Sequence, residues 1–193
     1  MDDVRRACAQ LPDPYRPGLG QPGYVYASVL MPFFEEDGLA RVVLTVRPDT
    51  MPSHRGDVAF PGGKMTPGVD GTLLDAALRE AEEEVGIPRA DVEIIGELDT
   101  LSTLTSRFVV APFIGALPGR PALVPDPREV ERAFDVALAD LLAEGVHREE
   151  RWDIGSTPHP VHFFDVEGEM VWGMTARILN ELLILVSFGA RDS

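Results

Sequence analysis

The pattern of hydrophobic and polar positions predicts a chain of alternating strands and helices. Residues 24–34 and 39–47 are rich in aromatic and β-branched side chains, and the turn Glu35-Glu36-Asp37-Gly38 between them predicts a β-hairpin. Residues 72–85 and 174–188 carry hydrophobic residues at helical spacing, which predicts two amphipathic helices. Further strands are expected at 92–100, 108–117, 161–166 and 169–172, a helix at 136–144, and loops at 48–57 and 117–128.

The order of these elements indicates the fold class. Strands come first, a helix follows, and strands and helices then alternate to the end of the chain, which predicts an α/β (α+β) sandwich with a mixed sheet. A length of 193 residues suits one domain with its own core. We expect a short helix and an irregular, proline-rich lead-in over residues 1–23, and the domain itself over 24–190.

Composition excludes several classes of protein. The formal net charge of −15 opposes binding to nucleic acid, whose backbone is also negative. Cys8 is the only cysteine, which rules out an intrachain disulfide and a cysteine-based metal site. The N-terminus is acidic and has no apolar run, and the longest apolar stretch, 182–190, is far short of the ~20 residues of a membrane-spanning helix. We therefore expect no membrane association and a cytoplasmic location.

The predicted helix at 72–85 carries a costly set of charges. At helical spacing Glu80, Glu83 and Glu84 share one face, whereas Glu82 lies on the opposite flank. Like charges four residues apart and acidic groups in a last helical turn both destabilise a helix. Such a cluster is either an ordinary acidic surface or a set of hard oxygen ligands suited to Mg²⁺ or Mn²⁺.

The sequence around this helix resembles a known motif. Gly62-Gly63 leads into Arg79-Glu80-Ala81-Glu82-Glu83-Glu84-Val85-Gly86-Ile87, which is similar to the second half of the Nudix box. The first half departs from the pattern, because the spacing is longer and Gly71 stands where the first box glutamate falls, beside Asp70. The resemblance implies a Nudix-type α/β/α sandwich and a metal-dependent pyrophosphohydrolase.

Three further segments resemble one branch of that family, the coenzyme A pyrophosphatases. They are Leu44-Thr45-Val46-Arg47, the loop from His54 to Gly63 that ends in Phe-Pro-Gly-Gly, and Trp172 to Leu179. This resemblance implies cleavage of the coenzyme A diphosphate bond, with 3′,5′-ADP and 4′-phosphopantetheine as products. Two alternatives stay open: a Nudix enzyme acting on another nucleotide such as ADP-ribose, and a non-catalytic Nudix nucleotide sensor.

The resemblance also assigns roles to individual residues. It implies that Glu80, Glu83 and Glu84 bind Mg²⁺ or Mn²⁺ and that Arg79 orients them, Glu80, Glu83 and Arg79 being the catalytic residues of the box. The general base is either a box glutamate or a carboxylate of another loop, where Glu129 is favoured over Glu131. The groups expected to contact the substrate phosphates are Arg47, Arg55, Gly62, Gly63 and Lys64, with His54 a weaker candidate. The sequence leaves open whether the protein is a monomer or a homodimer.

Overall fold

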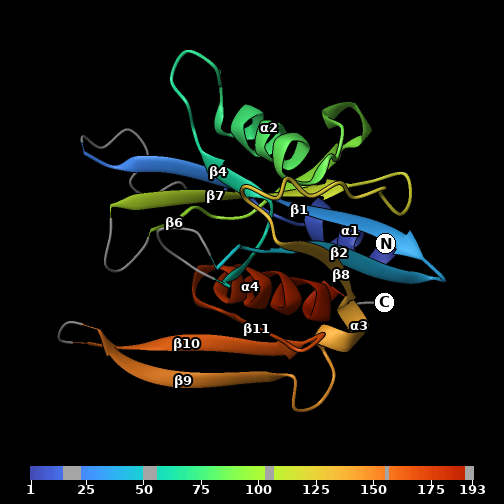
Figure 1. Ribbon diagram of the computed structural model, residues 1–193. Coiled ribbons are helices and arrows are strands. Elements are labelled where there is room, and N and C mark those ends of the chain that lie inside the picture. The colour runs from blue at the N-terminus through green and yellow to red at the C-terminus, as the bar shows by residue number, and fades with distance from the viewer. Residues whose placement is uncertain (15–22, 50–55, 103–106, 155–156, 190–193) are drawn as a thin grey trace.

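The computed structural model describes residues 1–14, 23–49, 56–102, 107–154 and 157–189 (Figure 1). Its helices are α1 (Asp2–Ala9), α2 (Leu73–Val85), the 3-10 helix η1 (Arg89–Asp91), α3 (Leu138–Leu141) and α4 (Gly173–Gly189). The first strands are β1 (Val25–Glu36), β2 (Leu39–Val46), β3 (Val58–Ala59), β4 (Gly62–Lys64), β5 (Glu93–Glu97) and β6 (Leu101–Ser102). The later strands are β7 (Phe108–Ala116), β8 (Arg132–Ala137), β9 (His147–Ile154), β10 (Thr157–Val166) and β11 (Glu169–Trp172).

A mixed sheet of eight strands forms the centre of the molecule. Its main path runs β3-β2-β1-β7-β5, with β4 added to β1, β6 to β7 and β8 to β2. β1 pairs antiparallel with β2 and parallel with β7, so the hairpin predicted from the sequence is the middle of this sheet. Helix α2 covers one face of the sheet and α4 lies on the other, which gives three layers (Figure 1).

A second, three-stranded antiparallel sheet lies beyond α4, with the strand order β11-β10-β9 (Figure 1). The main core fills the space between the eight-stranded sheet and α4, and it includes Phe33, Leu44, Ile178 and Leu182, each at most 1% exposed. Helix α1 packs against α4 and buries Val4 in the same core. A smaller cluster lies under α2, where the helix presents Ala77 and Ala81 to the sheet, and these small side chains let the helix approach it closely.

Most of the predicted elements are confirmed. The hairpin, α2, β5, β7, the β10–β11 hairpin and α4 all lie where the periodicity indicates. The helix expected at 136–144 is wrong in its first part, since residues 132–137 form strand β8 against β2 and only Leu138–Leu141 is helical. Strands β8 and β9 were not predicted.

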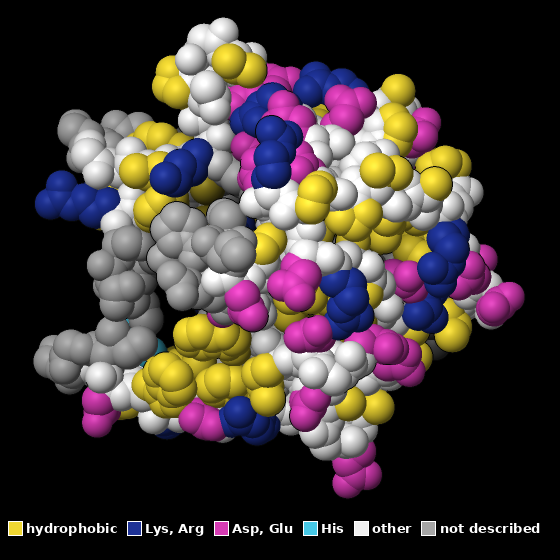
Figure 2. Space-filling model, in the orientation of Figure 1, with side chains coloured by type: hydrophobic (Ala, Val, Ile, Leu, Met, Phe, Trp, Pro, Cys, Tyr) yellow, Lys and Arg dark blue, Asp and Glu magenta, His cyan; other side chains and the backbone are white. Residues whose placement is uncertain are grey.

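Charged side chains of both signs are interspersed over much of the face in Figure 2, and hydrophobic side chains gather there over the three-stranded sheet. Among the residues that the structure describes, no helix combines the length and the hydropathy needed to cross a membrane.

Candidate active site

Helix α2 has defined ends that fix the direction of its carboxylates. The Thr72 side chain accepts a hydrogen bond from the Asp75 backbone N–H at 3.1 Å and donates to the Asp75 carboxylate at 2.8 Å. Gly86 ends the helix in the left-handed conformation, with φ of 72°. Between these ends Ala77, Ala81 and Val85 face the sheet and are fully buried, as the periodicity predicts.

The pair Gly62-Gly63 brings the backbone of β4 into contact with two of the helix carboxylates. The Gly62 N–H donates to Glu84 Oε2 at 3.0 Å. A β-carbon on Gly63 would lie 2.6 Å from the Glu80 carboxylate carbon, and one on Gly62 would lie 2.3 Å from the Ser28 carbonyl oxygen. Gly62 therefore has no room for a side chain where β4 pairs with β1, and the absence of a side chain at Gly63 leaves room for the Glu80 carboxylate.

A third carboxylate reaches the site from the loop that precedes β8. Helix ends leave carbonyl groups without partners inside the helix. The carbonyls of Glu84 and Val85 accept hydrogen bonds at 2.9 Å from the backbone N–H groups of Asp126 and Val124. Glu129 N–H in turn donates to Asp126 O, so the loop folds back over the helix end. This anchoring places Glu129 beside Glu80 and Glu84.

The carboxylates of Glu80, Glu84 and Glu129 form one cluster, in which one oxygen from each lies within 4.8 Å of the others. Burial raises the pKa of Glu84 to about 8, an effect that the Gly62 N–H only partly offsets. Burial also raises the pKa of Glu80. Three close carboxylates, one of them 5% exposed, are stable together when protons or a cation neutralise them, and hard oxygen donors at this spacing fit Mg²⁺ or Mn²⁺.

Beside the cluster, Arg79 binds three carboxylates, those of Asp70, Glu80 and Glu83. Its guanidinium donates to Asp70 through Nε at 2.9 Å and Nη2 at 3.0 Å, and it forms ion pairs at 2.9 Å with Glu80 and Glu83. The Thr66 N–H also donates to Asp70, at 2.7 Å. Hydrogen bonds from Arg79 hold the pKa of Asp70 below its ordinary value, and Asp70 holds the pKa of Arg79 above its own.

The predicted acidic residues are thus divided between two groups. Glu80 and Glu84 lie in the carboxylate cluster with Glu129, the favoured candidate for the base. Glu83 pairs with Arg79 as expected, but its side chain is 60% exposed and lies outside the cluster. Glu131 is exposed and is also outside it.

Among the basic residues expected to contact phosphate, Arg47 is the one whose charge acts on the cluster. It follows β2, its positive charge lowers the pKa of Glu84, and its Nε is buried without a hydrogen-bond partner among the described residues. Lys64 lies with Nζ 5.3 Å from the centre of the Phe108 ring and forms no ion pair with a described carboxylate. The predicted contacts of His54 and Arg55 lie outside the described residues.

The structure adds two interactions that sequence reasoning missed. Asp70 anchors Arg79, while Thr72 caps α2. The Trp172 indole N–H donates to Asp57 Oδ1 at 3.2 Å, which joins β11 to the segment leading into β3. No local pattern signals this second contact, because the residues are 115 positions apart.

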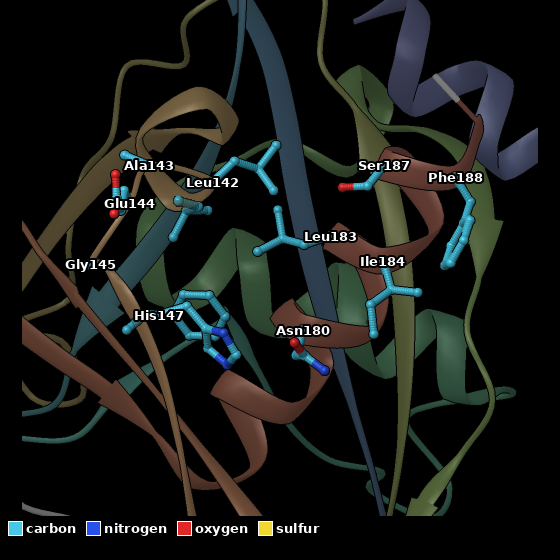
Figure 3. A pocket seen from close by; sticks show the side chains of 12 residues that line it. Leu142, Ala143, Glu144, Gly145, His147, Asn180, Leu183, Ile184, Ser187 and Phe188 are labelled. Carbon is cyan, nitrogen blue, oxygen red and sulfur yellow. The ribbon is translucent and has the colours of Figure 1, made fainter. Parts of the chain in front are cut away.

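A cavity of about 470 Å³ lies elsewhere, between the segment after α3 and helix α4 (Figure 3). His147 and Leu142 line one wall, and Asn180, Ile184 and Phe188 extend from α4 on the other. None of the clustered carboxylates lines it. Because α4 and α2 cover opposite faces of the sheet, this cavity is separate from the carboxylate cluster (Figure 1).

Comparison with known proteins agrees with this geometry. The sequence matches the NUDIX domain over residues 26–155. It is 35% identical over 181 residues to the Nudix hydrolase NudL of Photorhabdus laumondii, with 94% of each chain covered. It is 37% identical over 182 residues to NudL of Klebsiella pneumoniae, covering 93% of this chain and 90% of the relative.

Solved structures show the same fold at lower identity. A NUDIX hydrolase from Alicyclobacillus acidocaldarius superposes with a TM-score of 0.58 at 18% identity, over 83% of this chain and 91% of that one. A MutT/nudix family protein from Enterococcus faecalis also gives 0.58, at 14% identity, over 94% of this chain and 64% of that one. Sequence match, fold and carboxylate cluster lead to one assignment: the chain belongs to the Nudix hydrolase family.

Proposed function

We propose that this protein hydrolyses the diphosphate bond of coenzyme A in a reaction that depends on Mg²⁺ or Mn²⁺, releasing 3′,5′-ADP and 4′-phosphopantetheine. The observation that carries the proposal is the cluster of Glu80, Glu84 and Glu129 beside Arg47. The choice of coenzyme A rests on the sequence resemblance of residues 44–47 and 54–63 to the coenzyme A pyrophosphatases.

In this proposal Glu80 and Glu84 hold the metal, and Glu129 lies beside them. A divalent ion there would neutralise charge on the diphosphate and lower the pKa of a bound water. Arg79 fixes the position of Glu80 through its ion pair. Glu83 lies about one turn after Glu80 on α2 and pairs with Arg79. It stays a predicted metal ligand and catalytic residue.

The chain's own groups would orient the substrate and take the proton. Glu129 is exposed and comes from a loop, so it is the proposed base that accepts the proton of the attacking water. Arg47 and Lys64 would pair with phosphate oxygens, together with Arg55 from the segment before β3. Arginine suits this role because its planar fork can bind two oxygens of one phosphate, such as the 3′-phosphate of coenzyme A.

The first experiment is product analysis by mass spectrometry with coenzyme A and Mg²⁺, and ADP-ribose in a parallel reaction. The proposal predicts 3′,5′-ADP and phosphopantetheine from coenzyme A. Turnover of ADP-ribose alone would contradict the substrate assignment and leave the hydrolase intact. Failure to cleave either compound, with Mg²⁺ or Mn²⁺, would favour a nucleotide sensor.

A set of glutamine variants then tests the residue assignments. Glu80→Gln, Glu84→Gln and Glu129→Gln should each lower kcat/KM by at least about 100-fold, because each removes a charge from the cluster. Glu82→Gln is the matched control, since Glu82 lies on the other flank of α2 and faces Arg89 at 3.6 Å. Equal activity of all four variants would contradict the metal cluster.

A further inference from the structure

Two exposed tryptophans lie side by side on the three-stranded sheet. Trp152 of β9 and Trp172 of β11 are each 41% exposed, and their ring centres are 6.4 Å apart at an interplanar angle of 43°. They are the only tryptophans in the chain. Large aromatic side chains grouped at a surface are more often part of a binding site than of an inert exterior.

The two rings belong to one face of the sheet. Phe163 of β10 pairs with Arg148 of β9 on one side and with Trp172 on the other, so these three side chains share a face. The Trp152 ring lies 5.9 Å from that of Phe163, and the Arg148 guanidinium lies 4.0 Å from the Phe163 ring centre. Figure 2 shows the hydrophobic surface over these strands. Phe163 is buried beneath these side chains, and its ring packs against that of Trp152.

This face is joined to the segment that leads into the carboxylate cluster. Trp172 Nε1 donates to Asp57 Oδ1 at 3.2 Å, and the Arg47 N–H donates to Asp57 O at 3.0 Å. From Asp57 the chain reaches Gly62, whose N–H binds Glu84, in five residues. Trp172 and Arg47 thus contact the same residue, Asp57, and the charge of Arg47 acts on Glu84 of the cluster, which connects the aromatic face to the carboxylates.

We propose that Trp152 and Trp172 form an aromatic platform that stacks the nucleobase of the substrate. The inference rests on the proposed function for the diphosphate, which would lie at the cluster, with Arg47 between the two ends. A flat nucleobase can stack on exposed aromatic rings whatever its hydrogen-bonding edge. The hydrogen bond to Asp57 would hold the Trp172 ring beside the residues that precede β3.

Tryptophan fluorescence reports directly on this platform, because both tryptophans belong to it. We expect 3′,5′-ADP to quench the fluorescence of the whole protein in a saturable way. We expect 4′-phosphopantetheine, which has a phosphate but no base, to leave the fluorescence unchanged at the same concentrations. Quenching by phosphopantetheine alone, or by neither compound at concentrations that saturate the enzyme, would overturn the proposal.

Kinetics provide the second readout. Trp152→Leu should raise KM for coenzyme A by about 10-fold with little change in kcat, since stacking contributes to binding. Phe188→Leu is the control, because Phe188 is an exposed aromatic residue of α4 at the other cavity. A KM for Trp152→Leu equal to that of the control would refute the platform.

The two proposals fail in different ways. If coenzyme A is cleaved but 3′,5′-ADP does not quench, the platform is refuted and the function stands. If 3′,5′-ADP quenches the wild type and Trp152→Leu weakens its binding while no coenzyme A is cleaved, the platform is supported and the proposed reaction is refuted.

Discussion

Replacing Asp70 with alanine should destabilise the protein by about 3 kcal/mol, because it removes the main partner of a partly buried arginine. The Asp70 carboxylate is 2% exposed and accepts three hydrogen bonds, two from Arg79 and one from the Thr66 N–H. Breaking one side of a buried ion pair typically costs about 3–5 kcal/mol. The lower end applies here because Arg79 keeps its contacts with Glu80 and Glu83.

Urea unfolding followed by circular dichroism measures this loss. With an m-value of about 2 kcal/mol per molar urea, the midpoint should fall by about 1.5 M. Asp75→Ala is the matched control, since Asp75 is more exposed and bonds with the N-cap Thr72, so its loss should cost at most about 1 kcal/mol. Equal losses in the two variants would refute the reasoning that Asp70 anchors Arg79.

The same pair predicts a pH dependence with a definite sign. The pKa of Asp70 is lowered in the folded protein from an ordinary value of 3.8. A carboxyl group with a lowered pKa contributes stability above its unfolded-state pKa and loses it as pH falls through the folded-state pKa. The stability difference between wild type and Asp70→Ala should therefore be full at pH 7 and should shrink below about pH 4.

Three further predictions follow from the site and the core. Gly63→Ala should lower kcat/KM by about 100-fold with little loss of stability, because its β-carbon would displace the flexible Glu80 carboxylate; an unchanged rate would contradict the close approach. The pKa of Glu84 is raised to about 8, so its proton competes with a metal ion for the carboxylate. Calorimetry should therefore show the Mn²⁺ affinity of the wild type rising up to about 10-fold between pH 6.5 and 7.5, and Glu84→Gln should not show this rise. Cys8, buried with a pKa raised to about 11, should react with a disulfide reagent at pH 8 only after unfolding, and rapid native labelling would show that α1 opens.

Much of the fold could be predicted because its elements carry strong local patterns. Helix α2 has a buried stripe, a threonine cap and a glycine stop, and the β1–β2 hairpin has a polar turn between hydrophobic runs. Strand β8 was missed because its strand character depends on pairing with β2, about ninety residues earlier. Strand β9 reads His-Arg-Glu-Glu-Arg-Trp-Asp-Ile, and a strand this polar has no hydrophobic alternation to recognise.

Residue spacing alone predicts the site only where one helix supplies it, and the family resemblance supplied Glu129 and the glycine pair. Glu80 and Glu84 share a face at a spacing that the sequence shows, and both lie in the cluster. Glu129 joins them through backbone hydrogen bonds at the end of α2, which leave no mark on side-chain identity. The contact of Trp172 with Asp57 depends on how β11 packs against β3, so it also required the structure.

The parallel pairing of β1 with β7 has a consequence for how the protein folds. Val25 lies opposite Phe108 in the centre of the sheet, so this pairing closes a chain loop of about eighty residues that contains all of α2. Hairpins and helices form from neighbouring residues, whereas such a distant parallel pair is slow to form. After dilution from urea, helical circular dichroism should therefore recover before hydrolytic activity, because the carboxylates converge only on a completed sheet.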